Sequence, residues 1–378
     1  MHLRSRVAIL AFSGLIWLAV PGVEGQTPSQ TPGQGSPVRA PLPLNVDRDP
    51  APSPDPDNAP AAAAGPQTTG PQTTGPVSKS GTVTKGANGQ YTLTQDAYEV
   101  RLNASVIDGS GKSIQTLTKD AFHVYEDGVP QVLTSFRHED LPVSIGLLID
   151  SSGSMYDKRA AVDKASLDLV RLSNPKDEEF LVDFSSEAFI DQDFTSSLDK
   201  LQQGLSYIKS SGGTAAYDAL VASADYLTKN ARNPKQVLII ITDGEDNASS
   251  ATLEQAIRRI QDLDGPVIYC VGLLFGEDTD KRESKHARRV LESVAEQTGG
   301  TAYFPKSLKE VDQIAAEVAA DIRTQYTIAY RSTNPPSNGG YRRVHVEAKA
   351  TGFSRLDVRT RSGYYPRTSA KDVTGGTQ

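Results

Sequence analysis

The chain has 378 residues, 37% of them hydrophobic, which is enough apolar material to build a sizeable core. Its formal net charge of −7 argues against nucleic acid as the main partner. The single cysteine, Cys270, excludes an internal disulfide. Its place in an apolar run predicts a buried strand residue rather than a reactive thiol.

Residues 1–25 have the pattern of a secretory signal peptide. Arg4 and Arg6 precede an apolar run over residues 7–20, and small residues follow before Gln26. An exported chain with one cysteine suits a bacterial periplasmic or secreted protein. The alternative is an uncleaved segment that tethers the protein to a membrane, although the run is short for a full span. After signal cleavage we expect no membrane span.

Residues 26–80 are dense in Pro, Gly, Ser, Thr and Gln, and residues 65–76 contain a short repeat. Such a composition cannot bury enough surface to offset its ordering entropy, so we expect a disordered spacer. The spacer could provide reach from a membrane or wall, or it could have no selected role. The polar residues 367–378 are expected to form a disordered tail.

Residues 90–141 show the two-residue alternation of apolar and polar side chains that is typical of β-strands. Apolar and polar side chains alternate from Tyr98 to Val106, which predicts a strand buried on one face. Asp127-Gly128 between apolar residues predicts a hairpin. Since a few strands need a covering sheet, we expect these residues to pair with the strands predicted in residues 326–366. Together they would form a small β-sandwich around an inserted domain.

The inserted domain, residues 142–325, alternates buried strands with amphipathic helices. This alternation predicts an α/β fold with a doubly wound, mostly parallel sheet and helices on both faces. Strands are expected at 143–149, 180–184, 237–241 and 266–274, and helices at 158–172, 198–210, 215–228, 252–263, 284–298 and 308–324.

Five oxygen-bearing side chains are predicted to meet at one edge of this sheet. Asp150 and Asp243 each follow an apolar strand, Ser152 and Ser154 lie in the loop after the first strand, and Thr214 precedes a helix. Ligands bind at the carboxyl ends of strands in open parallel sheets. An all-oxygen cluster suits a hard divalent cation, above all Mg²⁺, with Mn²⁺ or Ca²⁺ as alternatives.

Each of these pieces also has an ordinary structural interpretation. A serine-rich turn after a strand is usually a helix N-cap, and Asp-Gly is usually only a turn. The combination favours a metal site, because two ionised carboxylates that converge at a sheet edge repel each other unless a cation lies between them.

The pattern D-x-S-x-S with a distant Thr and a distant Asp-Gly resembles the metal-ion-dependent adhesion site of von Willebrand factor A (VWA) domains. The resemblance extends over about residues 143–325. It implies that Asp150, Ser152, Ser154, Thr214 and Asp243 hold the metal, with one coordination position open for an acidic group of a protein partner. The flanking segments 126–131 and 363–365 resemble those of bacterial VWFA-related proteins.

Catalytic motifs are not supported. Phosphatases of the D-x-D type need a second acid where Ser152 stands, and neither a G-x-S-x-G elbow nor a phosphate-binding glycine loop occurs. The five histidines are placed in unrelated segments, so none is an evident base for the serines: His2, His123, His138, His286 and His345. We therefore expect a protein that is not an enzyme.

The sequence predicts an exported, adhesion-type binding module whose divalent cation accepts a carboxylate from a protein partner. One alternative is an assembly module with a structural metal and contacts through the β-sandwich. Another is a hydrolase whose metal activates water. The basic cluster at 280–289 is interpreted as a solvated helix face rather than an anion-binding surface. Glu245 and Asp246 either tune the metal or are exposed loop acids.

Overall fold

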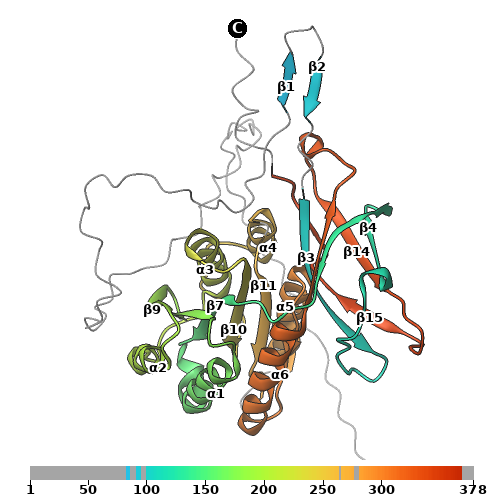
Figure 1. Cartoon of the computed structure of the whole chain (residues 1–378). Coiled ribbons are helices and arrows are strands. Elements are labelled where there is room, and N and C mark those ends of the chain that lie inside the picture. The colour runs from blue at the N-terminus through green and yellow to red at the C-terminus, as the bar shows by residue number, and fades with distance from the viewer. Residues whose placement is uncertain (1–81, 86–90, 95–98, 264, 276–280, 368–378) are drawn as a thin grey trace, which may run out of the picture. The chain divides into compact units, whose positions relative to one another are not determined.

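The computed structural model describes residues 82–85, 91–94, 99–263, 265–275 and 281–367 (Figure 1). The predicted signal peptide, the predicted spacer and, apart from Arg367, the predicted tail lie outside these residues.

A six-stranded sheet forms the centre of the α/β domain, in the order β12-β11-β10-β7-β8-β9. Every pair of neighbours is parallel except β8 and β9, which are antiparallel. The predicted α/β fold with a mostly parallel sheet is therefore confirmed, while the two edge strands β9 and β12 were not predicted. The strands are β7 (Val143–Asp150), β8 (Glu178–Phe184), β9 (Ala188–Thr195), β10 (Lys235–Thr242), β11 (Val267–Gly272) and β12 (Ala302–Tyr303).

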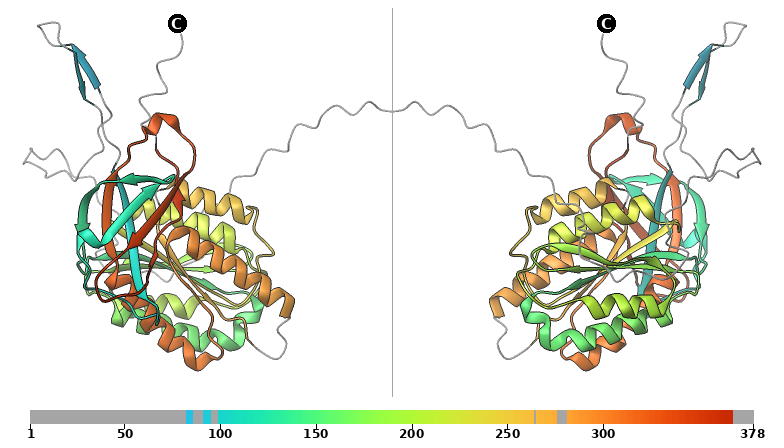
Figure 2. Two further views of the ribbon diagram at one scale, coloured as in Figure 1. Left: turned by 90° about the vertical axis from the view of Figure 1, so that its right-hand side faces the viewer. Right: turned by 90° about the vertical axis from the view of Figure 1, so that its left-hand side faces the viewer.

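Helices cover both faces of this sheet (Figure 2). One apolar core joins the sheet to α1, α2 and α6, and a second joins the opposite face to α3, α4 and α5. The helices are α1 (Arg159–Leu172), α2 (Leu198–Tyr207), α3 (Ala216–Asn230), α4 (Leu253–Asp262), α5 (Lys281–Thr298) and α6 (Val311–Thr324).

The central strands are apolar throughout because both of their faces are buried. In β7, Ile145 and Ile149 belong to the core under α1, whereas Leu148 packs with Phe180 in the opposite core. Burial of each such side chain contributes about 1.5–3 kcal/mol to folding. These two cores hold the carboxyl ends of β7 and β10 side by side, where the predicted metal site lies.

Two four-stranded antiparallel sheets accompany the α/β domain, in the orders β15-β3-β13-β6 and β16-β14-β4-β5. Their apolar faces share one core. Strands from both sides of the α/β domain pair directly, since Ala104 of β3 lies opposite Tyr326 of β13. The strands are β3 (Glu99–Asp108), β4 (Phe122–Glu126), β5 (Val129–Gln131), β6 (Leu133–Arg137), β13 (Tyr326–Arg331), β14 (Arg342–Ala348), β15 (Leu356–Arg359) and β16 (Gly363–Tyr364). A separate hairpin consists of β1 (Thr82–Lys85) and β2 (Tyr91–Thr94).

The predicted hairpin at Asp127-Gly128 joins β4 to β5. Asp127 has φ 49° and Gly128 has φ 81°, so both central residues of the turn are in the left-handed region. This is the backbone of a type I′ turn, which matches the twist of paired strands and favours the Asp-Gly sequence.

A buried polar cluster ties the hairpin to the end of the described chain. Glu126 accepts hydrogen bonds from Tyr330 (2.7 Å), Tyr364 (2.8 Å) and Ser332 (2.6 Å). The Arg342 guanidinium lies 3.4 Å from the same carboxylate, and both side chains are almost completely buried. Residues from before and after the α/β domain therefore meet at the buried carboxylate of Glu126.

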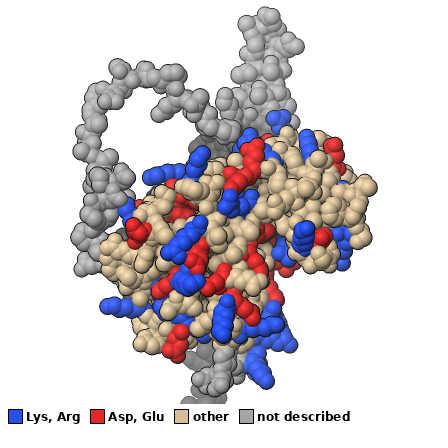
Figure 3. Space-filling view, turned by 60° about the horizontal axis from the view of Figure 1, so that its bottom comes forward, with Lys and Arg blue, Asp and Glu red and all other residues tan. Residues whose placement is uncertain are grey.

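Acidic and basic side chains are intermingled on the face shown in Figure 3, which is typical of a solvated surface. Among the described helices, none combines the length and the apolar composition that a membrane crossing requires.

Candidate metal site

The two predicted aspartate ligands follow neighbouring parallel strands. Ile149 of β7 lies opposite Ile241 of β10, so Asp150 and Asp243 emerge at the same edge of the sheet. A short 3₁₀-helix, η3 (Gly153–Lys158), carries the chain from β7 into α1.

Asp150 is a buried carboxylate held in a fixed orientation. Its Oδ1 accepts a hydrogen bond from the Ser152 backbone N–H (2.8 Å), and its Oδ2 accepts one from the Thr242 hydroxyl (2.5 Å). Burial raises the pKa of the Asp150 carboxyl, and the hydrogen bonds from Ser152 and Thr242 oppose that rise. The carboxylate thus has donors on both oxygens but no opposite charge directly bonded to it.

A chain of hydroxyl groups leads from the first loop to Asp243. The hydroxyls of Ser152 and Ser154 are 3.1 Å apart, and the Ser154 hydroxyl donates to Asp243 Oδ1 at 2.8 Å. Four of the five predicted residues are therefore brought together at the ends of β7 and β10. Their role as metal ligands stays a prediction.

The backbone of Thr214 contacts the loop that follows Asp243. Its N–H donates to Asn247 Oδ1 (2.9 Å), and its carbonyl accepts from the Asn247 N–H (2.9 Å). A Cβ on Gly244 would lie 3.9 Å from the Thr214 hydroxyl oxygen. Unlike the other four, Thr214 has no side-chain hydrogen bond to the cluster within the described part of the chain.

The glycines before Thr214 allow this close approach. Gly212 has φ 83°, in the left-handed region, and a Cβ on Gly213 would lie 2.6 Å from Asn247 Oδ1. Larger residues at these positions would push Thr214 away from the loop that follows Asp243.

Sequence patterns did not indicate Lys158, which reaches the centre of the cluster. Its Nζ lies 2.5 Å from Asp243 Oδ2, and the Asp243 side chain is only 1% exposed. The same ammonium lies 5.9 Å from the centre of the Phe275 ring. Local spacing did not reveal this contact, because Ser154 and Lys158 lie in the 3₁₀-helix η3, where side chains align three residues apart rather than four.

Several other polar residues form hydrogen bonds that connect the loops of the site to neighbouring elements. Ser151 donates to Asp183 Oδ2 at 2.7 Å, and Asp183 lies on the neighbouring strand β8. Asp246 accepts from the Tyr217 N–H (3.0 Å) and from the Ser249 hydroxyl (2.5 Å). Asp246 therefore connects the loop after β10 to the start of α3.

The donor chemistry of the cluster fits a hard cation. Within the described residues, no group of three or more His, Cys, Asp or Glu side chains could hold a metal, so a divalent site here depends on hydroxyl oxygens. The desolvated Asp243 carboxylate already has a cation, the Lys158 ammonium, directly against it. A buried carboxylate of this kind requires positive charge, which Lys158 provides here and which a divalent ion bound among these oxygens would also provide.

The serine hydroxyls have carboxylate partners rather than histidine partners. Ser151 bonds to Asp183, and Ser154 bonds to Asp243. His138 instead stacks on Tyr326 with ring centres 4.4 Å apart. Within the described residues, no histidine is hydrogen-bonded to Ser151, Ser152 or Ser154.

Several solved structures are similar to the chain at low sequence identity. One is a von Willebrand factor type A protein from Catenulispora acidiphila, with 15% identity, a TM-score of 0.42, and coverage of 69% of this chain and 78% of that chain. BatB from Bacteroides thetaiotaomicron has 19% identity, a TM-score of 0.37, and coverage of 47% and 98%. The vWF domain of the type V pili tip protein Mfa5 from Porphyromonas gingivalis has 14% identity, a TM-score of 0.39, and coverage of 48% and 97%.

The family model of the von Willebrand factor type A domain matches residues 144–317. No curated protein matches the sequence. The matched segment contains the whole six-stranded sheet apart from Val143. Residues 144–317 of this chain are a von Willebrand factor type A domain.

Proposed function

We propose that this VWA domain binds a protein partner through a divalent cation, Mg²⁺ in the first place and Mn²⁺ or Ca²⁺ as alternatives. VWA domains are commonly protein-interaction modules. The observation that supports the proposal best is the run of contacts from Ser152 through Ser154 to Asp243, next to the fixed carboxylate of Asp150. Thr214 would be the fifth ligand.

The ligand set favours the capture of an acidic group. When bound, the cation would accept a carboxylate oxygen from an Asp or Glu of the partner. Two carboxylates balance the formal charge of a divalent ion and three neutral hydroxyls add no negative charge, so this site accepts an incoming acid more readily than a site ringed by carboxylates. The contacts of the serine hydroxyls with carboxylates support a binding role without catalysis.

Lys158 gives the site an internal counter-charge. Its ammonium lies against Asp243 and neutralises that carboxylate. Metal binding would then exchange one cation for another, because both compete for the same desolvated carboxylate. The Phe275 ring beside Lys158 offers the ammonium a second favourable contact.

We also propose that the protein is exported, to the periplasm or the exterior. The support comes from the predicted signal peptide and spacer, residues 1–25 and 26–80, which lie outside the described residues. A charged, mixed surface on the face of Figure 3 and the net charge of −7 support a protein partner rather than nucleic acid.

The test is cation-dependent capture of a partner. The purified protein is incubated with the exported proteins of its own cell and crosslinked in Mg²⁺ or in EDTA, and mass spectrometry identifies the captured species. Titration calorimetry measures Mg²⁺ and Mn²⁺ binding directly. We expect Asp150→Asn and Asp243→Asn to lose both metal binding and capture.

Asp199→Asn is the matched control, because Asp199 is an exposed acid at the start of α2. It should retain both properties. Equal capture by the wild-type protein in EDTA and in Mg²⁺ would refute the proposal.

A further inference from the structure

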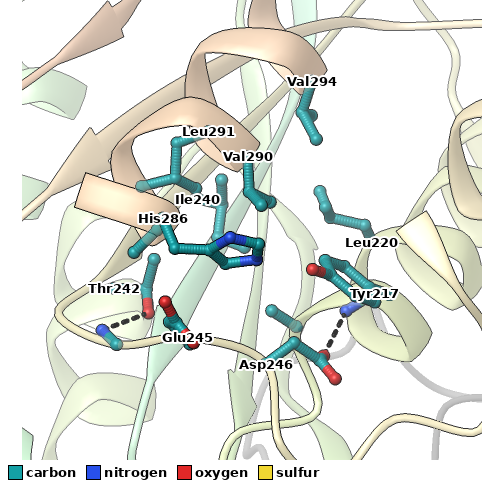
Figure 4. A pocket seen from close by; sticks show the side chains of 13 residues that line it. Tyr217, Leu220, Ile240, Thr242, Glu245, Asp246, His286, Val290, Leu291 and Val294 are labelled. Atoms are coloured by element: carbon teal, nitrogen blue, oxygen red, sulfur yellow. Dashed lines mark hydrogen bonds between the residues drawn. The ribbon is translucent and has the colours of Figure 1, made fainter. Parts of the chain in front are cut away.

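A small cavity of about 40 Å³ lies beside the candidate metal site, between α3, α5 and the end of β10 (Figure 4). Its floor is apolar, since Leu220, Ile240, Leu291 and Val294 line it. A cavity with such a floor favours a side chain that can bury methylene groups.

The cavity and the metal site share one stretch of backbone. Thr242 lines the cavity and also donates its hydroxyl hydrogen bond to Asp150. Gly244, another lining residue, directly follows Asp243. The cavity and the metal site therefore adjoin each other, within reach of neighbouring side chains of one bound protein segment.

The mouth of the cavity carries negative charge. Glu245 and Asp246 lie there together with Tyr217 and His286 (Figure 4). Asp246 is already bound by the Tyr217 N–H and by Ser249. Glu245 is half-buried, and among the described residues its carboxylate has no hydrogen bond or ion pair.

No lysine or arginine of α5 is among the described residues that line the cavity. The residues of α5 that line the cavity are His286 and four apolar side chains, and Arg288 instead stacks on Phe304 at 4.1 Å. Within the described part of the chain, Glu245 is therefore the charged lining residue whose carboxylate has no hydrogen bond or ion pair.

We propose that the cavity receives a lysine or arginine side chain of the same protein segment whose carboxylate binds the metal. The aliphatic stem would pack on the apolar floor while the cationic head reaches Glu245. An acidic occupant would be repelled by Glu245 and Asp246. A purely apolar one would desolvate the Glu245 carboxylate without pairing it, which costs free energy. This inference rests on the proposed metal-dependent function and adds a sequence requirement to it.

Synthetic peptides provide the test. Fluorescent peptides with a Gly-Ser background carry one Asp and, at each neighbouring position in turn, Lys, its neutral analogue norleucine, or Glu. Binding to the purified protein is measured by polarisation in Mg²⁺ and in EDTA. In at least one register we expect the Lys peptide to bind in Mg²⁺ about tenfold more tightly than the norleucine peptide.

Two variants connect this preference to the cavity. Glu245→Gln should bring the ratio of Lys to norleucine affinity close to one, and Val290→Phe should weaken the Lys peptide by filling the cavity. The control Glu296→Gln makes the same charge change at an exposed position of α5 that does not line the cavity, so it should keep the preference.

The outcomes separate the two proposals. Mg²⁺-dependent binding of Asp peptides with equal affinity for Lys and norleucine would overturn the cavity inference and leave the metal site standing. Equal loss of the preference for Lys in Glu245→Gln and Glu296→Gln would also overturn the cavity inference. The preference would then reflect the net charge of the protein alone. No Mg²⁺-dependent binding by any Asp peptide would overturn both proposals.

Discussion

At the scale of single residues, Asp243 combines near-complete burial with full engagement of its carboxylate. Ser154 donates to one oxygen, and the Lys158 ammonium lies against the other. A desolvated carboxylate is costly unless it is hydrogen-bonded and paired. Because the Asp243 carboxylate needs a positive charge beside it, the stability of the site depends on the Lys158 ammonium or on a divalent ion that replaces it.

The Lys158→Met variant tests this connection, because Met keeps a long apolar side chain and removes the charge. In EDTA we expect unfolding free energy to fall by about 1–3 kcal/mol, since Asp243 loses its cation. The stabilisation by Mg²⁺ should exceed that of the wild type, since the competing ammonium is gone. Thermal unfolding across a Mg²⁺ titration measures both effects.

Lys176→Met is the matched control for this variant, because Lys176 is exposed. It should change neither the stability in EDTA nor the response to Mg²⁺. A Lys158→Met protein that binds Mg²⁺ no more tightly than the wild type would contradict the exchange of cations.

Glu179 gives a separate prediction about pH. Its side chain is buried and its Oε2 has no hydrogen-bond partner. Burial, with the nearby charges of Asp177 and Glu178, raises the pKa of Glu179 to about 8. The folded state therefore holds a proton that the unfolded state releases at a much lower pH. The stabilisation is complete below the unfolded pKa and is lost as pH rises through about 8.

In Glu179→Gln this pH dependence should disappear, because the amide cannot titrate. Between about pH 5 and pH 8.5, we expect the wild type to lose roughly 2–4 kcal/mol more unfolding free energy than the variant. Urea unfolding at both pH values measures the difference, in which the other titrating groups largely cancel. Parallel pH profiles for the two proteins would show that Glu179 is ionised in the folded state.

At the scale of secondary-structure elements, Glu126 at the end of β4 holds together strands from both sides of the VWA domain. Its partners include Arg342 of β14, Tyr330 of β13 and Tyr364 of β16. The charged pair is shielded from water, so either residue alone would be a buried, uncompensated charge.

We expect Arg342→Met to lower the unfolding free energy of the flanking sheets by about 3–5 kcal/mol. The double variant Glu126→Gln/Arg342→Met should recover part of this loss, because no unpaired charge remains. Guanidinium unfolding of the wild type, the single variants Glu126→Gln and Arg342→Met, and the double variant gives the coupling energy. Additive effects of the two single changes would contradict a direct interaction.

At the scale of the whole molecule, the chain closes its flanking sheets only after the VWA domain is complete. β3 precedes that domain and β13 follows it, yet the two strands pair along their length. The family match ends at residue 317, so these sheets lie outside the matched segment. The VWA domain is therefore an insertion between strands that depend on each other for a covering partner.

The sequence predicted a strand or turn correctly where one local pattern extends over the whole element. The uniform apolar runs of β7 and β10 indicated strands buried on both faces, and Asp127-Gly128 indicated the hairpin. β9 was missed because its side chains are mostly half-buried and mix Phe and Ile with Asp and Gln. Its pairing with β8 also contains register shifts, which local pattern does not encode.

The order of residues by itself determined the α/β alternation and the positions of Asp150 and Asp243 at strand ends, because hydrophobic period and strand direction are local properties of the chain. Only the tertiary structure decided that Lys158 meets Asp243 and that Glu245 faces an apolar cavity. Those contacts join segments far apart in sequence. Their geometry follows from how α3, α5 and the helix start after β7 pack around the sheet.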